Sequence, residues 1–133
     1  MIALDTNVLV RYLVRDEPRQ TAAATRLLES ACTEASPGIV TQVVLCELTW
    51  VLDRGYRYSR SQIAEILRGL LGATDLAIES SELAWQALNR YQAGKADFAD
   101  YVLGLAGRTQ KAEITVTFDR QAASSELFRL ISA

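Results

Sequence analysis

The chain opens with a short apolar run that ends in an acid, and this pattern constrains the fold more than any other. The run Ile2 to Leu4 predicts a buried strand, and Asp5 follows it directly. Thr6 or Asn7 then suits the N-cap of a helix. Ligands and catalytic groups gather where the strands of an open parallel sheet end, so Asp5 is a candidate functional residue. Alternatively, Asp5 simply caps the helix, whose N-terminus favours negative charge.

The rest of the chain alternates short apolar runs with stretches of helical spacing. This alternation favours an α/β fold in which helices cover both faces of a parallel sheet. The length of 133 residues predicts a single domain over residues 1–133. Further strands are expected at residues 39–41, 76–78, 113–118 and, as an edge strand or a helix, 128–131. Helices are expected at 8–14, 19–34, 42–53, from a cap at Ser59 or Ser61 to 72, 82–92 and 97–108.

The composition limits the chemistry that is open to the chain. It has no histidine and only two cysteines, Cys32 and Cys46, without metal-ligand spacing. Catalysis by Ser-His-Asp or Cys-His groups and zinc sites are therefore excluded, and acid–base or metal chemistry must use carboxylates. Both cysteines are expected to be buried free thiols, which fits a cytoplasmic protein. No signal peptide and no membrane span is expected.

Glu47 lies within a predicted helix among apolar neighbours. The residues three and four positions away are Val43, Val44, Trp50 and Val51. An ionised carboxylate buried in such surroundings is costly unless a cation or strong donors meet it, which marks Glu47 as a functional candidate. The alternative is a glutamate at the edge of the apolar stripe whose carboxylate reaches water.

Three further aspartates occupy similar positions later in the chain. Asp97 and Asp100 open a predicted helix and share one face, where Asp97 also suits the N-cap. Gly104 and Gly107 continue along that face, which indicates close approach by another group. Asp119 follows a predicted strand, as Asp5 does, and could also cap the turn after it.

Several convergent carboxylates repel one another unless divalent cations neutralise them. Oxygen ligands without histidine or cysteine select Mg²⁺ or Mn²⁺. Such an ion activates water and stabilises charge in phosphoryl chemistry. The chain has no Gly-rich phosphate loop, which argues against a P-loop nucleotidase.

Four short motifs together resemble the PIN-domain family, and in particular its VapC-type toxins. They are the segment 2–7, Glu47, the segment 96–100 and the segment 116–119. The resemblance runs to about Arg120 and implies a three-layer α/β/α sandwich with a central parallel sheet of four or five strands. It also implies an Mg²⁺- or Mn²⁺-dependent endoribonuclease whose cleavage leaves 5′-phosphate and 3′-hydroxyl ends.

The same resemblance assigns roles to individual residues. The catalytic and metal-binding acids would be Asp5, Glu47, Asp100 and Asp119, with Asp97 as either a fifth ligand or a helix cap. The residues that would orient these acids are Thr6, Asn7 and Thr117. A VapC-like chain would form a homodimer and would be inhibited by a small VapB-type antitoxin.

Basic and aromatic residues supply candidates for RNA contact. The net charge is −2, but eight of the fourteen basic residues are arginines before residue 69. The candidates for contact with phosphates or bases are Arg11, Arg15, Arg54, Arg57, Arg60, Tyr56 and Tyr58. The Arg/Tyr turn at 54–60 could instead be a solvated loop or a patch for the antitoxin.

Other functions use the same residues. One is a non-catalytic PIN-like module that binds protein, although such a module would have no reason to keep buried acids. Another is a metal-dependent nuclease in RNA processing, or one that acts on DNA. A phosphatase with an aspartyl nucleophile is disfavoured, because a second aspartate is expected where Asn7 stands.

Overall fold

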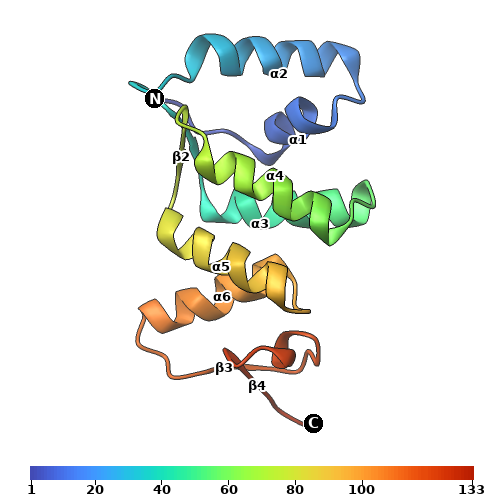
Figure 1. Cartoon of the computed structure of the whole chain (residues 1–133), viewed down its shortest axis with the longest axis vertical. Helices are drawn as coiled ribbons and strands as arrows, with labels where there is room; N and C mark the ends of the chain where they lie inside the picture. Colours follow the sequence, from blue (N-terminus) through green and yellow to red (C-terminus); the bar gives the residue numbers. More distant parts are fainter. The chain divides into compact units, whose positions relative to one another are not determined.

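The computed structural model describes all 133 residues, which divide into two compact units, Met1–Ser81 and Glu82–Ala133. Figure 1 shows the course of the chain through both. Each unit is described by itself, because their positions relative to one another are not determined.

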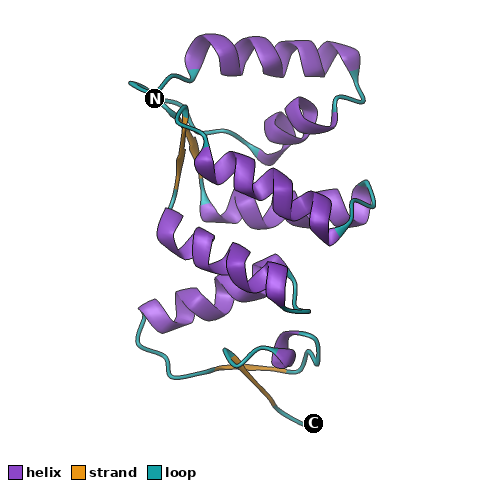
Figure 2. Cartoon of the chain, in the orientation of Figure 1, coloured by secondary structure: helices purple, strands orange, loops and turns teal.

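The first unit is built on a short parallel sheet with β1 in its middle. The elements of this unit are α1 (Thr6–Val14), α2 (Pro18–Ala31), β1 (Gly38–Val40), α3 (Gln42–Trp50), the π-helical turn η1 (Val51–Gly55), α4 (Arg60–Gly72) and β2 (Leu76–Ile78). β1 pairs in parallel with β2, with Gly38 opposite Leu76 (Figure 2). On its other side, a parallel bridge joins Ala3 to Ile39. The expected extended segment at residues 2–4 therefore adjoins the sheet and leads directly to Asp5.

Local capping explains where the helices of this unit begin. The N-cap of α1 is Asp5, whose side chain accepts a hydrogen bond from the N–H of Thr6, so the expected cap at Thr6 or Asn7 is wrong. Asp and Thr are both favoured as N-caps, and the pattern alone does not choose between them. As expected, α2 starts with Pro18 in its first turn and Ser59 caps α4.

Helix α3 carries Glu47 and packs against α1. Its inner side chains Leu45 and Leu48, and Leu52 just after it, are fully buried. The α-helical part ends at Trp50 and continues as the π-helical turn to Gly55, whereas one α-helix to residue 53 was expected. Such turns widen a helix locally and are frequent at functional sites.

The second unit packs two helices and a second parallel strand pair. Its elements are α5 (Ser81–Ala93), which starts one residue before the unit, α6 (Phe98–Thr109), β3 (Thr115–Thr117), the 3₁₀ turn η2 (Ala122–Ser124) and β4 (Phe128–Leu130). β3 pairs in parallel with β4, so residues 128–131 form a strand and not a helix. The rings of Tyr91 on α5 and Phe98 on α6 meet edge to face at 6.1 Å.

Both units combine helices with parallel strands, which confirms the α/β class. The named strands form two separate pairs, and one sheet of four or five strands stays a prediction. None of the helices has the length and apolarity that crossing a membrane requires. Both cysteines are free, as expected, but only Cys32 is fully buried.

Candidate functional site

In the first unit, Thr6 links two of the candidate acids. Asp5 Oδ1 accepts a hydrogen bond of 2.8 Å from the N–H of Thr6. The hydroxyl of Thr6 donates to Glu47 Oε1 at 2.7 Å, across 41 residues of sequence. Thr6 is 6% exposed, whereas both acids are exposed. The buried residue Thr6 therefore holds two solvent-facing carboxylates, Asp5 through its backbone N–H and Glu47 through its hydroxyl.

Glu47 does not lie in an apolar interior, so that expectation was wrong. Two of its apolar neighbours on α3, Val43 and Trp50, are 68% and 59% exposed. The carboxylate projects from an exposed face that also carries an aromatic ring, as in the alternative that placed it at the edge of the stripe. Asn7 does not join this group, because it lines a separate pocket between α1 and α2 with Arg11 and Gln20.

In the second unit, Asp97 and Asp119 both act on Asp100. Asp97 is the N-cap of α6, and its N–H donates to Asp100 Oδ2 at 3.2 Å. Partial burial raises the pKa of Asp100 above its ordinary value. The carboxylates of Asp97 and Asp119 raise this pKa further, and the hydrogen bond from the Asp97 N–H opposes them. A nearby cation would therefore favour the charged form of Asp100.

Asp119 is fixed by its own turn. Its Oδ1 accepts hydrogen bonds from the N–H groups of Gln121 at 2.8 Å and Ala122 at 3.4 Å. Its own N–H donates to the hydroxyl of Thr117 at 3.0 Å. The alternative that Asp119 caps the turn after it is thus confirmed, and Thr117 orients it through the backbone.

The two glycines of α6 are explained by packing inside the second unit. A Cβ atom on Gly104 would lie 2.9 Å from Leu127 Cβ, and one on Gly107 would lie 3.1 Å from Thr115 Oγ1. The close approach that these glycines indicated comes from the chain itself, around β3 and β4, and not from a ligand.

The donor chemistry of the candidate acids fits a hard divalent cation, because every side-chain donor is a carboxylate oxygen. Asp5 and Glu47 belong to the first unit, and Asp100 and Asp119 to the second. Within either unit, no three potential metal-ligating side chains gather into one group.

Comparison with known proteins places the chain in a family. A model of the PIN domain matches residues 2–125, which span both units and contain all four acids. The chain belongs to the PIN-domain family. A VapC ribonuclease from Aquifex aeolicus (strain VF5) is 23% identical to this PIN domain over 121 residues, which cover 91% of the chain and 89% of that protein.

Among the basic candidates of this PIN domain, Arg11 already has partners inside the first unit. Its guanidinium donates to Gln20, to Asp16 Oδ1 at 3.1 Å and to the hydroxyl of Tyr56 at 3.2 Å. Arg11 therefore ties α1 to the start of α2 and to the Arg/Tyr turn. Tyr56 also meets Tyr58 edge to face at 6.4 Å.

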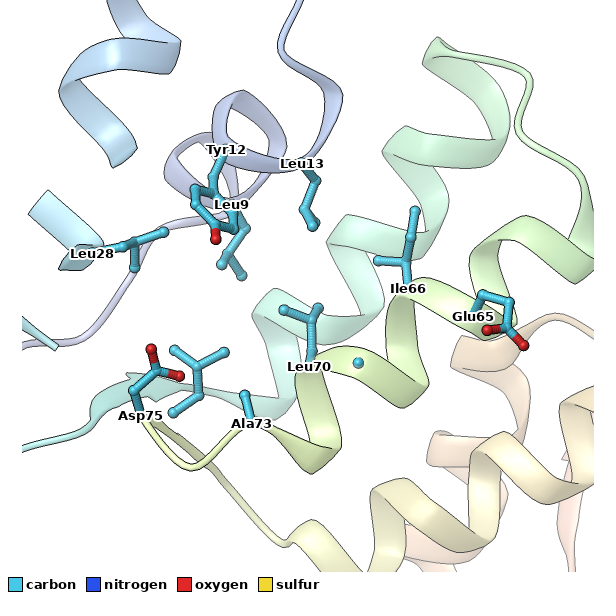
Figure 3. A pocket seen from close by; sticks show the side chains of 11 residues that line it. Leu9, Tyr12, Leu13, Leu28, Glu65, Ile66, Leu70, Ala73 and Asp75 are labelled. Atoms are coloured by element: carbon cyan, nitrogen blue, oxygen red, sulfur yellow. The ribbon is translucent and has the colours of Figure 1, made fainter. Parts of the chain in front are cut away.

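An apolar pocket of about 280 Å³ lies between α1, α2 and α4 (Figure 3). Leu9 and Tyr12 of α1, Leu28 of α2 and Leu70 of α4 point into it. Gly69 also lines the pocket. None of the candidate acids lines this pocket.

Proposed function

We propose that this PIN domain is a metal-dependent endoribonuclease and the toxin of a VapBC-type pair. The match to the PIN-domain model and the similarity to a protein named VapC ribonuclease support the proposal. The observation that carries it is the hydrogen bond from Thr6 to Glu47. A side chain next to Asp5 thereby fixes a second acid that caps no helix and is exposed to solvent.

In this proposal, Asp5, Glu47, Asp100 and Asp119 hold Mg²⁺ or Mn²⁺, and Asp97 is the cap of α6. Residues 1–133 would form one domain whose strands join in a single central sheet within an α/β/α sandwich.

The side chains of the protein would fix the geometry of the reaction. Thr6 orients Asp5 through its N–H and Glu47 through its hydroxyl, and Thr117 orients Asp119. The bound ion would activate water and neutralise charge on the phosphate. Cleavage would leave 5′-phosphate and 3′-hydroxyl ends.

The proposed partners are RNA, a VapB-type antitoxin and a second copy of the chain, in the cytoplasm. Since Arg11 and Tyr56 bind each other, Arg54 and Arg57, which form no ion pair, are better placed for RNA than Arg11. Arg15, Arg60 and Tyr58 stay candidates.

Cleavage of a mixed RNA pool by the purified chain tests the proposal. We expect cleavage in Mg²⁺, none in EDTA, and a loss of at least about a hundredfold in Asp5→Asn, the scale of removing one charge-stabilising group from an active site. Asn caps helices as well as Asp does, so the fold should persist. Asp75→Asn, which changes an exposed acid outside the candidate set, should cleave like the wild type. Equal cleavage by Asp5→Asn and Asp75→Asn would refute the assignment.

A non-catalytic binding module is the second candidate, and one observation favours it. Asp5, Asp97 and Asp119 all cap helices or turns, which gives each a purely structural role. That module would show neither RNA cleavage nor measurable Mg²⁺ binding while remaining folded.

A further inference from the structure

Trp50 is a large aromatic side chain that the fold leaves open. It ends α3 with 59% of its surface exposed. Its neighbours along the helix include Glu47 on one side and Asp53 and Arg54 on the other, all charged and exposed. A surface that binds another protein normally has a continuous apolar patch at its centre. The ring of Trp50 instead has these charged side chains as neighbours.

The π-helical turn after α3 places a cation on this ring. The guanidinium carbon of Arg54 lies over the ring of Trp50, 5.8 Å from its centroid. Arg54 forms no ion pair in the structure. The two side chains therefore form a positively charged cation–π plate, which suits a flat π system attached to an anionic backbone.

A polar pocket adjoins the plate. Asp53, Arg54, Arg57 and Tyr58 line a volume of about 390 Å³. Arg57 adopts a left-handed conformation with φ of 57°, and its N–H donates to the carbonyl oxygen of Asp53 at 3.0 Å. Arg57 also has no carboxylate partner. Two guanidinium groups without ion-pair partners thus line a pocket that begins at the plate.

We propose that Trp50 stacks an unpaired nucleobase of the RNA substrate, while Arg54 and Arg57 bind the neighbouring phosphates. Trp50 lies three residues after Glu47, about 5 Å along the same helix. The stacked base therefore belongs to a nucleotide close to the scissile phosphate. This inference rests on the proposed ribonuclease function and adds a specificity for single strands, because a paired base cannot stack on a side chain.

Fluorescence of Trp50 tests the stacking directly. The chain has two tryptophans, so Trp85→Phe leaves Trp50 as the only one. Asp5→Asn in the same chain prevents cleavage. Titration with an unstructured oligouridylate should quench the fluorescence of Trp50. The same strand with abasic sugars, or annealed to oligoadenylate, should quench it much less.

RNA binding by point variants measures how much the stacked base contributes to affinity. Trp50→Ala should weaken binding of the oligouridylate by about 5- to 150-fold, the range for loss of one base–aromatic stack. Trp50→Phe should retain most of the affinity, which would attribute the loss in Trp50→Ala to the missing aromatic ring, and thermal denaturation of Trp50→Ala checks that this variant is folded. Val43→Ala is the matched control, because Val43 is also exposed on α3, at 68%, and lies two turns from Trp50. It should bind RNA like the wild type.

The outcomes separate this inference from the proposed function. If the wild type cleaves RNA, Trp50→Ala binds RNA with unchanged affinity and the fluorescence of Trp50 is not quenched, the stacking is overturned and the proposed ribonuclease function stands. The outcome is also negative if Trp50→Ala and Val43→Ala both change the oligomeric mass of the protein in solution but keep their RNA affinity. That result would identify this face as a protein interface and would overturn the stacking. A wild type that neither binds nor cleaves RNA in Mg²⁺ would overturn both.

Discussion

The hydrogen bond from Thr6 to Glu47 gives the most direct test of how the site is held together. Valine has the shape of threonine and lacks only the hydroxyl, so Thr6→Val removes this bond of 2.7 Å from a buried position. A hydrogen bond to a charged group contributes about 1.5–3 kcal/mol. Water can hydrate the exposed Glu47 after the change, and the new methyl group recovers up to about 0.8 kcal/mol by burial. We expect a net loss of about 1 kcal/mol.

Thermal and chemical denaturation in EDTA measure this loss. For a chain of this length, 1 kcal/mol corresponds to a decrease in Tm of about 3–5 °C. A double-mutant cycle with Glu47→Gln isolates the pair, and the coupling free energy should be about 1 kcal/mol. Thr6→Ser keeps the hydroxyl and should retain most of the coupling.

RNA cleavage by the same variants measures the functional part. Loss of a group that orients a metal ligand typically lowers activity by about 10- to 100-fold, and we expect this for Thr6→Val, with Thr6→Ser close to the wild type. Two results together would show that the bond does not position Glu47. The effects of Thr6→Val and Glu47→Gln on stability would be additive, and Thr6→Ser and Thr6→Val would cleave RNA equally well.

Three other substitutions probe packing, capping and charge. A Cβ atom on Gly69 of α4 would meet no atom within 4 Å, so Gly69→Ala should stabilise the protein by about 0.5–1 kcal/mol. A Cβ atom on Gly104 would lie 2.9 Å from Leu127 Cβ, so Gly104→Ala should destabilise it by about 1–3 kcal/mol. Urea denaturation of both variants measures these changes. Asp97→Ala should lower the free energy of unfolding by about 1 kcal/mol, because α6 loses its N-cap. Asp97→Asn should keep both stability and RNA cleavage. A folded but inactive Asp97→Asn variant would show that Asp97 is a metal ligand. The pKa of Asp100 is raised in the folded state, so the folded chain binds its proton more tightly than the unfolded chain, and the stability from this group declines as pH rises from 3.8 through the raised pKa. In EDTA, the Tm of Asp100→Asn relative to the wild type should therefore increase over that range, and a constant difference would contradict the raised pKa.

The order of elements was predictable because it depends on local signals. Strand β2 spans residues 76–78 as expected, and Ser59 caps α4. Apolar runs, caps and breaks in periodicity act over a few residues, so the sequence carries them directly. The joining of strands into one sheet depends on contacts between distant segments, which no local pattern specifies.

The environment of the candidate residues was less predictable. The apolar neighbours of Glu47 indicated burial, but no element covers Val43 and Trp50. Helical spacing shows which residues share a face and not whether that face is covered. Likewise, nothing in the sequence around Arg11 shows that its guanidinium reaches Tyr56, which lies 45 residues later.

The capping roles of the aspartates weaken the inference from these acids to nuclease activity in related chains. Asp5, Asp97 and Asp119 each begin a helix or turn, so selection for folding alone would retain them in a relative that had lost all nuclease activity. An intact set of aspartates is therefore weak evidence for an active enzyme. Glu47 begins no element and lies exposed in the middle of α3. During the evolutionary decay of such an enzyme, folding would retain Glu47 only through its hydrogen bond from Thr6, so joint change at positions 6 and 47 is more informative than the capping aspartates for separating active members of the family from inactive ones.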